Sequence, residues 1–256
     1  MQAAQLVNAC EQLNVPSALS TMLGSSRTDS QTAAAGLLGA MLQYPEYAEL
    51  LEGANVLAPL LTALRGSKTE LKSKAASALV SLTSSVQGRV QLREAGGLNA
   101  LLDILLAGGS VHAETWEAVC TVLANLCDDD GEDWRQLSQA GIVFALTSQL
   151  SNSNVALQEA LLTLLAILCS HPECREQAAD ASAMPPLVRL LGSSKTAVQR
   201  VALALTQQLC GSRRACDTML EVGACAPLAA LLSTSAAGDV EVAVAALECI
   251  EALARS

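Results

Sequence analysis

Residues 184–191 read Met-Pro-Pro-Leu-Val-Arg-Leu-Leu, and the interpretation of the whole chain starts from them. Gly192 and a polar turn at 193–196 follow this stretch, and a longer apolar run occupies 197–205. Proline is tolerated in the first turn of a helix, and glycine favours the position just beyond its end. The stretch therefore predicts a short helix, a turn and then a longer helix.

Similar stretches recur along the chain at a spacing near forty residues. The gap that contains the acidic loop 128–133 is the longest, and it also contains a long turn at 107–112. Units that recur in phase at this length are typical of a repeat array, in which each unit packs on its neighbours. The leucine after the proline serves as the anchor, with gaps of 41, 41, 45, 41 and 41: Leu19, Leu60, Leu101, Leu146, Leu187 and Leu228.

Each unit is predicted to contain a short first helix, a second helix with the anchor and a long third helix. First helices are expected at 45–51, 87–93, 134–138, 172–178 and 213–220. Apolar residues recur at i, i+3, i+4 and i+7 in the third helices, which indicates packing on more than one side; these helices are expected at 31–43, 71–84, 114–127, 156–170, 198–211 and 240–254. A small residue before the second helix permits a sharp turn: Gly53, Gly96, Gly141 or Gly223.

The composition supports a helical fold. Hydrophobic residues make up 51% of the 256 positions and aromatic residues only 2%, so Leu, Ala and Val must build the core. Such a core favours close-packed helices over sheets that need bulky strand residues. The net charge of −10 argues against a nucleic-acid partner, since such proteins usually carry a basic face.

The nine cysteines are odd in number, and no pair has the close spacing of a zinc knuckle or a redox motif. Most lie in apolar runs, where a free cysteine acts as a small hydrophobic residue. We therefore expect a reducing, cytoplasmic location, with the nucleus and the cilium as open alternatives. No apolar run reaches the roughly 20 residues that span a bilayer, so no integral membrane segment is expected.

Three stretches resemble the armadillo repeat: 184–191, the turn Arg-Glu-Ala-Gly-Gly-Leu at 93–98, and Val-Leu-Ala-Asn-Leu at 122–126. HEAT repeats are the close rival because their period overlaps. The resemblance implies an all-α, right-handed α-solenoid of three-helix repeats that forms a single domain over 1–256. Its six repeats would cover approximately 1–43, 44–85, 86–128, 129–170, 171–211 and 212–256.

The resemblance also implies a non-catalytic scaffold or adaptor that binds a segment of a partner protein along the concave surface of the third helices. An alternative interpretation of the same polar residues is an ordinary solvated face. The candidate partner-binding residues are Lys74, Ser77, Ser81, Glu117, Thr121, Asn125, Glu159, Thr163, Arg200 and Gln208.

Members of the family that act as nuclear-import adaptors hold a peptide backbone with a ladder of asparagines, each with a tryptophan one turn earlier. The asparagine positions correspond here to Ala40, Ser81, Asn125, Ile167, Gln208 and Ala252. The tryptophan positions correspond to Gly36, Ser77, Thr121, Thr163, Ala204 and Glu248. Since only two amides and no tryptophan are present, an import-adaptor role is disfavoured.

Motifs for chemistry are weak. The segments 66–69 and 192–196 contain Gly, Ser, Lys and Thr, but they lack the order of a phosphate-binding loop, and Ser/Thr-rich helix caps explain them. The acidic loop 128–133 lacks the spacing of a calcium-binding loop; its last carboxylates would cap the next helix, or it would dock a basic segment. His112 and His171 belong to no nucleophile or metal motif. We expect no enzyme activity, cofactor or metal.

Charge is uneven along the chain. Residues 53–94 contain six basic and two acidic residues, and residues 95–139 contain one basic and eight acidic residues. Residues 181–221 contain five basic and two acidic residues. This alternation could set the register of a bound chain. It could equally reflect weak salt bridges between neighbouring repeats.

Two alternatives to a complete scaffold remain open. One is a co-chaperone that promotes nucleotide exchange on the 70-kDa heat-shock chaperone, since armadillo-fold proteins of similar length and acidity have this role. The other is that the chain is a domain of a larger armadillo protein. An apolar last helix favours this second alternative or self-association through the end repeats: Val240, Val242, Val244 and Leu247.

Overall fold

The computed structural model describes residues 8–44, 47, 56–106, 112–127, 132–235 and 240–255. Within these ranges the regular structure is helical, as the all-α prediction requires. The chain divides into two compact units, Met1–Leu126 and Cys127–Ser256. The division lies two residues from the predicted boundary between the third and fourth repeats, so each unit contains three repeats.

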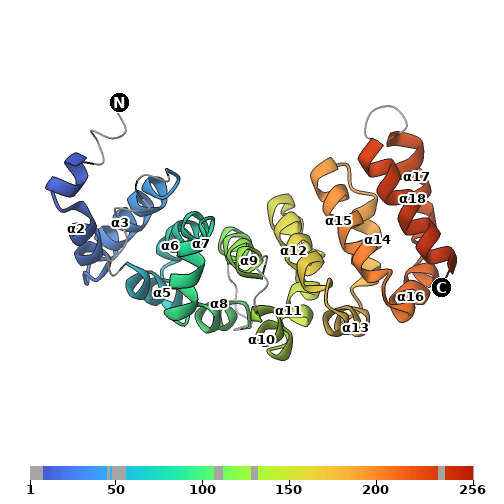
Figure 1. The fold of residues 1–256 in the computed structure, drawn as a ribbon, viewed down its shortest axis with the longest axis horizontal. Coiled ribbons are helices and arrows are strands. Elements are labelled where there is room, and N and C mark those ends of the chain that lie inside the picture. The colour runs from blue at the N-terminus through green and yellow to red at the C-terminus, as the bar shows by residue number, and fades with distance from the viewer. Residues whose placement is uncertain are drawn as a thin grey trace. The chain divides into compact units, whose positions relative to one another are not determined.

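In the first unit, second and third helices alternate along the chain (Figure 1). The short helix α2 packs on α3, and α5 packs on both α6 and α8. The helix α7 lies between α6 and α8 in the chain and contacts both. The helices are α2 (Val15–Leu23), α3 (Thr28–Met41), α5 (Leu57–Arg65), α6 (Thr69–Thr83), α7 (Val86–Glu94), α8 (Gly97–Leu106) and α9 (Ala113–Cys127).

The second unit shows the complete first-second-third pattern in every repeat (Figure 1). The third helix of each repeat packs on the third helix of the next repeat. The first helices α13 and α16 also pack on each other. The helices are α10 (Asp133–Gln139), α11 (Ile142–Gln149), α12 (Val155–Leu168), α13 (Pro172–Asp180), α14 (Met184–Leu191), α15 (Thr196–Leu209), α16 (Arg213–Val222), α17 (Cys225–Ser235) and α18 (Val240–Arg255).

The predicted helices are confirmed where the structure describes them. Every third helix begins and ends within three residues of its predicted bounds. Five of them start earlier than predicted, three by two or three residues because their first residues, Thr28, Thr69 and Thr196, are polar and carry no apolar periodicity. The predicted first helix at 45–51 lies, apart from Tyr47, outside the described residues.

The six anchor leucines form the centre of the core. Leu19 is 2% exposed, and the other five are fully buried. Burying a leucine side chain stabilises a fold by roughly 1.5–3 kcal/mol. The anchors therefore fix the register of the repeats, and the alignment that placed them is confirmed.

A left-handed backbone residue lies five positions before five of the six anchors, and the position five before Leu60 lies outside the described residues. Glycine occupies three of these sites, and Ser182 and Asn14 occupy the other two. This conformation lets the chain turn sharply between helices. Glycine adopts it without steric cost because it has no Cβ. The predicted turn glycine Gly53 lies outside the described residues. The φ angles are 52° at Asn14, 69° at Gly96, 77° at Gly141, 55° at Ser182 and 88° at Gly223.

The prediction that Ser or Thr side chains cap α6 and α15 is wrong. The N-cap residues are Lys68 and Lys195, and no side chain accepts a hydrogen bond from the first turn of either helix. Instead, the Ser193 hydroxyl accepts a hydrogen bond from the backbone N–H of Lys195 at 3.2 Å. Serine thus stabilises the turn before the helix rather than the helix end.

The acidic loop is described from Glu132 onward, and its predicted capping role is only partly confirmed. Asp133 lies in the first turn of α10, where a carboxylate is favoured by the helix dipole. Glu132 is the N-cap residue, but its side chain does not cap the helix. The Glu132 carboxylate instead pairs with Arg135 at 2.5 Å.

Of the four apolar residues that make the end helix α18 a candidate for contact with another chain, three are exposed and one is buried. Val242 is only 4% exposed because it faces the body of the unit. Val240, Val244 and Leu247 are exposed by 73%, 47% and 54%. They follow one another at i, i+4 and i+7, so they form a single apolar stripe on the outer side of the helix.

All nine cysteines lie within the described residues as free thiols, and five of them are buried. This fits their predicted use as small core residues. No described helix is, by itself, both long and apolar enough to cross a membrane. The helices α16 and α17 reach that length and composition together, but the chain bends by 78° between them.

Candidate functional site

The third helices form a continuous row within each unit. In the first unit α3 packs on α6, and two hydrogen bonds connect α6 to α9. In the second unit α12 packs on α15 and α15 packs on α18 (Figure 1). We call the accessible side of the row in each unit its third-helix face; the two faces together include the ten candidate residues Lys74, Ser77, Ser81, Glu117, Thr121, Asn125, Glu159, Thr163, Arg200 and Gln208.

The structure brings the candidate residues into stripes along single helices. Residues four apart lie on one side of a helix, so the three candidates on α9 align with one another, as do the pairs on α6 and α12. None of the ten is buried, which satisfies the first requirement for a binding residue. Lys74, Ser77 and Arg200 are exposed, and the other seven are half-buried.

Three candidate hydroxyl groups are already engaged with their own helices. Thr121 Oγ1 donates to the carbonyl of Glu117 at 2.9 Å, and Thr163 Oγ1 donates to the carbonyl of Glu159 at 2.8 Å. Ser81 Oγ makes the same contact with the carbonyl of Ser77 at 3.4 Å. Each hydroxyl therefore keeps only acceptor capacity for a ligand.

Asn125 ties two repeats together. Its Nδ2 donates to Oγ1 of Thr83 at 3.1 Å, and Thr83 is fully buried in α6. Thr83 in turn donates to the carbonyl of Leu79 at 2.9 Å. One of the amide donors that a peptide ladder would require is thus committed to a bond inside the protein.

Sequence reasoning missed a second set of polar contacts between neighbouring third helices. Ser73 Oγ donates to a Glu114 carboxylate oxygen at 3.3 Å, and Gln207 Nε2 donates to Glu248 at 2.6 Å. Both pairs are separated by 41 residues, which is the repeat period. A search for polar pairs at that separation could have found them.

Two grooves open on the third-helix face. The larger, of about 890 Å³, lies between the N-terminal halves of α3 and α6 and includes Gly36 and Lys74. The smaller, of about 180 Å³, lies between α15 and α18 and includes Arg200 and Ala204. Gly36 and Ala204 occupy positions that correspond to the tryptophan of import adaptors, so small residues leave space where those proteins have a large ring.

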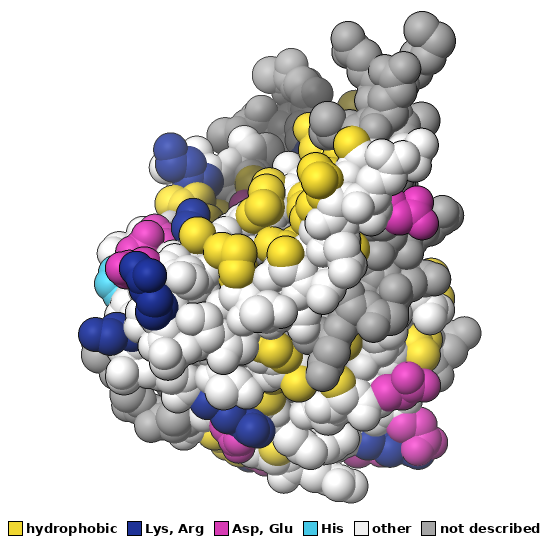
Figure 2. All heavy atoms as spheres, turned by 90° about the vertical axis from the view of Figure 1, so that its left-hand side faces the viewer, with side chains coloured by type: hydrophobic (Ala, Val, Ile, Leu, Met, Phe, Trp, Pro, Cys, Tyr) yellow, Lys and Arg dark blue, Asp and Glu magenta, His cyan; other side chains and the backbone are white. Residues whose placement is uncertain are grey.

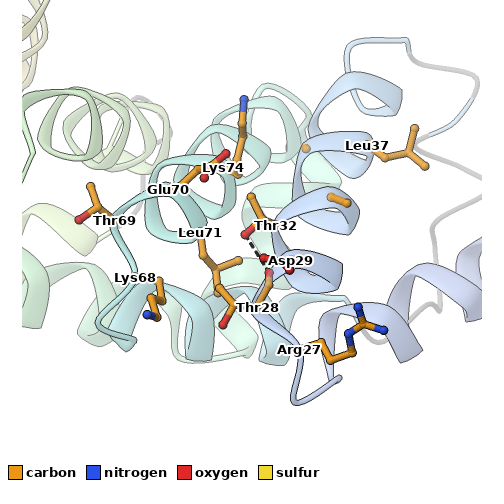
Figure 3. Close-up of a pocket in the computed structure, with 12 residues that line it drawn as sticks. Arg27, Thr28, Asp29, Thr32, Leu37, Lys68, Thr69, Glu70, Leu71 and Lys74 are labelled. Carbon is orange, nitrogen blue, oxygen red and sulfur yellow. Dashed lines mark hydrogen bonds between the residues drawn. The ribbon is translucent and has the colours of Figure 1, made fainter.

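Figure 3 shows how the larger groove is bounded. Lys68, Glu70 and Lys74 belong to the α6 side, whereas Arg27 and Asp29 belong to the α3 side. At the other end the helices approach tightly, because a Cβ added to Gly39 would lie 3.3 Å from the Cα of Ala78. Close packing at one end and polar side chains at the other make a groove that is open to solvent.

An aromatic contact lies between residues at the starts of the first helices α10 and α13. The rings of Trp134 and His171 stack with centroids 3.8 Å apart and planes 7° apart. The guanidinium of Arg135 lies 5.2 Å from the Trp134 ring centre. Burial lowers the pKa of His171 from its ordinary value, the charge of Glu173 opposes this shift, and the charges of Arg135 and Arg175 add to it. His112 is exposed.

Within the part of the chain that the structure describes, no three His, Cys, Asp or Glu side chains gather as a metal site would require. The buried thiols are also poorly suited to nucleophilic chemistry. Burial raises the pKa of Cys169 to about 12, and it raises the pKa of Cys174. A thiol in such surroundings stays protonated at neutral pH and is unreactive.

A family model matches residues 11–247 of the chain; it describes the armadillo-repeat region of plant U-box proteins. The match covers more than nine tenths of the sequence and includes all six anchor leucines. No curated protein sequence matches the chain significantly.

Solved structures share the fold. An engineered protein is 23% identical, with a TM-score of 0.82, over 94% of this chain and 99% of its own. A protein from computationally designed armadillo repeats for modular peptide recognition is 22% identical, with a TM-score of 0.78, over 91% and 98%. A designed armadillo repeat protein in complex with the peptide (KR)4 is 22% identical, with a TM-score of 0.76, over 92% and 98%.

Proposed function

The chain belongs to the armadillo-repeat family that the plant U-box repeat region represents, and from this premise we propose that it is a non-catalytic protein-interaction scaffold. It binds an extended segment of a partner protein along the third-helix face. The α-solenoid fold supports this role because stacked repeats present a long surface to a linear ligand.

One observation carries the proposal: the third-helix face combines accessible polar side chains with open grooves between helices. The polar stripes on α6, α9 and α12 are accessible, one groove lies beside α6 in the first unit, and the other lies between α15 and α18 in the second unit. A ligand could insert side chains between the helices while polar residues bind its flanks. The solved complex of a designed armadillo repeat protein with the peptide (KR)4 supports the binding of a linear peptide by this fold.

We propose that the partner is held by side-chain recognition rather than by an amide ladder. Of the two amides at ladder positions, Asn125 is already bonded to Thr83, and Gln208 is half-buried. Gly36 and Ala204 leave space at two tryptophan positions. These features support a specificity different from that of nuclear-import adaptors.

Selection from a random peptide library on the immobilised chain, followed by fluorescence titration, tests the proposal. We expect the paired substitution Glu117→Arg and Glu159→Arg to lower the affinity for a selected peptide by roughly tenfold, because it reverses the charge on two stripes of polar residues. The control is Glu176→Arg, an exposed site on the first helix α13. Equal weakening by the control, or no weakening by the pair, would contradict binding on this face.

We also propose a reducing intracellular location. The nine free thiols support it, since an oxidising compartment would favour disulfides among so many cysteines. Imaging of the fluorescently tagged chain together with thiol alkylation tests this. A secreted protein with alkylation-resistant cysteines would contradict it.

A further inference from the structure

Three cationic side chains line the groove between α3 and α6 on a chain with a net charge of −10. Arg27, Lys68 and Lys74 line it, together with Asp29 and Glu70. The whole chain has 25 acidic and 15 basic residues, so most cations would be expected to find a carboxylate. A local excess of positive charge here is therefore a distinctive feature of the surface.

The charged groups of Arg27, Lys68 and Lys74 form no hydrogen bond or ion pair with any residue that the structure describes, although the backbone N–H of Arg27 donates to Oγ of Ser25. Cations elsewhere do pair: Arg65 lies 3.3 Å from Asp103, and Arg214 lies 2.5 Å from Asp180. Arg255 likewise pairs with Glu251. The groove thus keeps its positive charge available to a ligand, whereas these other cations are neutralised by partners within the protein.

The two carboxylates of the groove cancel only part of this charge, because they face three cations. Asp29 and Glu70 both lie in the first turn of their helices, where the positive end of the helix dipole already favours them. Arg27 and Lys68 are N-cap residues, and the same dipole opposes their charge. The net field in the groove is therefore positive and favours an acidic occupant.

The geometry also provides space and apolar surface. A Cβ added to Gly36 would lie 3.8 Å from Cδ of Lys74, so the aliphatic part of this lysine passes close to α3 and its ammonium group lies at the groove. Leu37 and Leu71 add apolar lining. No aromatic side chain lines the groove, so the base-stacking contacts typical of nucleic-acid binding have no partner there.

We propose that the α3–α6 groove binds an acidic peptide segment of a partner protein, with carboxylates against Lys68 and Lys74 and an apolar side chain beside Gly36. This inference rests on the proposed function and specifies the partner's chemistry for one part of the face. It predicts a preference opposite to that of the designed protein that was solved with (KR)4.

Fluorescence titration of the full chain with labelled (EL)4, (KL)4, (SL)4 and a short single-stranded DNA tests the inference. We expect (EL)4 to bind best and to weaken severalfold when salt rises from about 50 to about 300 mM. The double substitution Lys68→Glu and Lys74→Glu should weaken it by roughly tenfold or more. The matched control is Lys195→Glu, which reverses charge at the equivalent N-cap in the second unit and should leave the affinity within about twofold.

A second pair of variants tests the groove without changing its charge. Gly36→Phe should fill the space beside Lys74 and weaken (EL)4 by roughly tenfold, whereas Gly36→Ala should bind as the unmodified chain does. Circular dichroism checks that both variants fold. Loss of binding in Gly36→Ala alone would contradict the assigned position.

The outcomes separate this inference from the proposed function. If (KL)4 or (SL)4 binds better than (EL)4, or if the lysine substitutions have no effect, the acidic preference is wrong while peptide binding stands. If the DNA binds best and the lysine substitutions abolish its binding, the groove is a nucleic-acid site. If none of the probes binds, the inference is wrong, and the library selection decides the proposed function independently.

Discussion

Single residues set the path of the chain between helices. Five positions before five of the six anchor leucines, the backbone has a positive φ, although three different residue types occupy that position. Glycine adopts this conformation freely, asparagine tolerates it, and serine adopts it at a cost. The turn geometry requires the positive φ, and the residue type at this position only changes how much strain the turn contains.

We therefore expect Gly223→Ala to lower the free energy of unfolding by about 1 kcal/mol, because a Cβ is disfavoured at a φ of 88°. Nothing lies within 4 Å of the added Cβ, so the loss would come from the backbone alone. Ser182→Gly at the equivalent position should change it by less than about 0.5 kcal/mol, since relieved strain offsets the greater freedom of the unfolded chain. Urea denaturation measures both. If Gly223→Ala left the free energy of unfolding unchanged, the turn would be able to change its backbone conformation to accept a Cβ.

His171 should make the stability of the second unit depend on pH. Burial lowers its pKa in the folded protein, so the unfolded chain takes up a proton more readily as pH falls through the usual histidine range. Stability is therefore highest with neutral His171 and decreases as pH falls below about 6.5.

We expect His171→Gln to show a smaller loss of the urea midpoint between about pH 7.5 and 5.5 than the unmodified chain. His112→Gln, at an exposed site, should behave as the unmodified chain does. NMR titration of the His171 imidazole gives the direct measurement, and its midpoint should lie below the usual value. An ordinary midpoint would contradict the role of burial.

At the scale of helices, periodicity explains why the sequence predicts the elements so well. Third helices pack on two or more neighbours, so their apolar residues recur strongly at helical spacing. The anchor leucines of second helices are buried at every repeat. Helix starts were less accurate because Thr28, Thr69 and Thr196 are polar first-turn residues.

Leu187→Asp tests the importance of an anchor. Leu187 is fully buried in α14, which contacts α15, α16 and α17, and an unpaired carboxylate there should cost about 3–5 kcal/mol. Arg189→Asp on the same helix is the surface control and should cost less than about 1 kcal/mol. Thermal unfolding followed by circular dichroism measures the difference. An unchanged cooperative transition in Leu187→Asp would contradict the assigned register.

At the scale of the molecule, the terminal repeats expose apolar surface. Figure 2 shows apolar side chains gathered at the N-terminal end of the first unit, where Leu13, Met22 and Leu37 are exposed. At the other terminus, α18 exposes its apolar stripe. End repeats normally need polar outer faces for solubility, so these surfaces favour association with another chain. The single-domain organisation over 1–256 stays a prediction.

We expect the chain to self-associate through the α18 stripe at high concentration. The double substitution Val244→Glu and Leu247→Glu should abolish a concentration-dependent increase in mass without unfolding the chain, because both side chains are about half exposed. Sedimentation velocity measures the mass. Glu241→Gln and Glu248→Gln, at exposed acidic sites on the same helix, should not abolish association. Association that persists in the apolar double variant would contradict this role.

The sequence by itself determined the number, type and register of the repeats, and it placed the ten candidate residues on accessible helix faces. Local periodicity and turn chemistry suffice for this because each repeat packs its apolar residues against its neighbours in the same way. Only the tertiary structure decided that Asn125 bonds Thr83, that Val242 is buried and that Lys74 passes beside Gly36 at an open groove. These facts depend on how neighbouring helices approach one another, and the periodicity of a single helix contains no information about that approach.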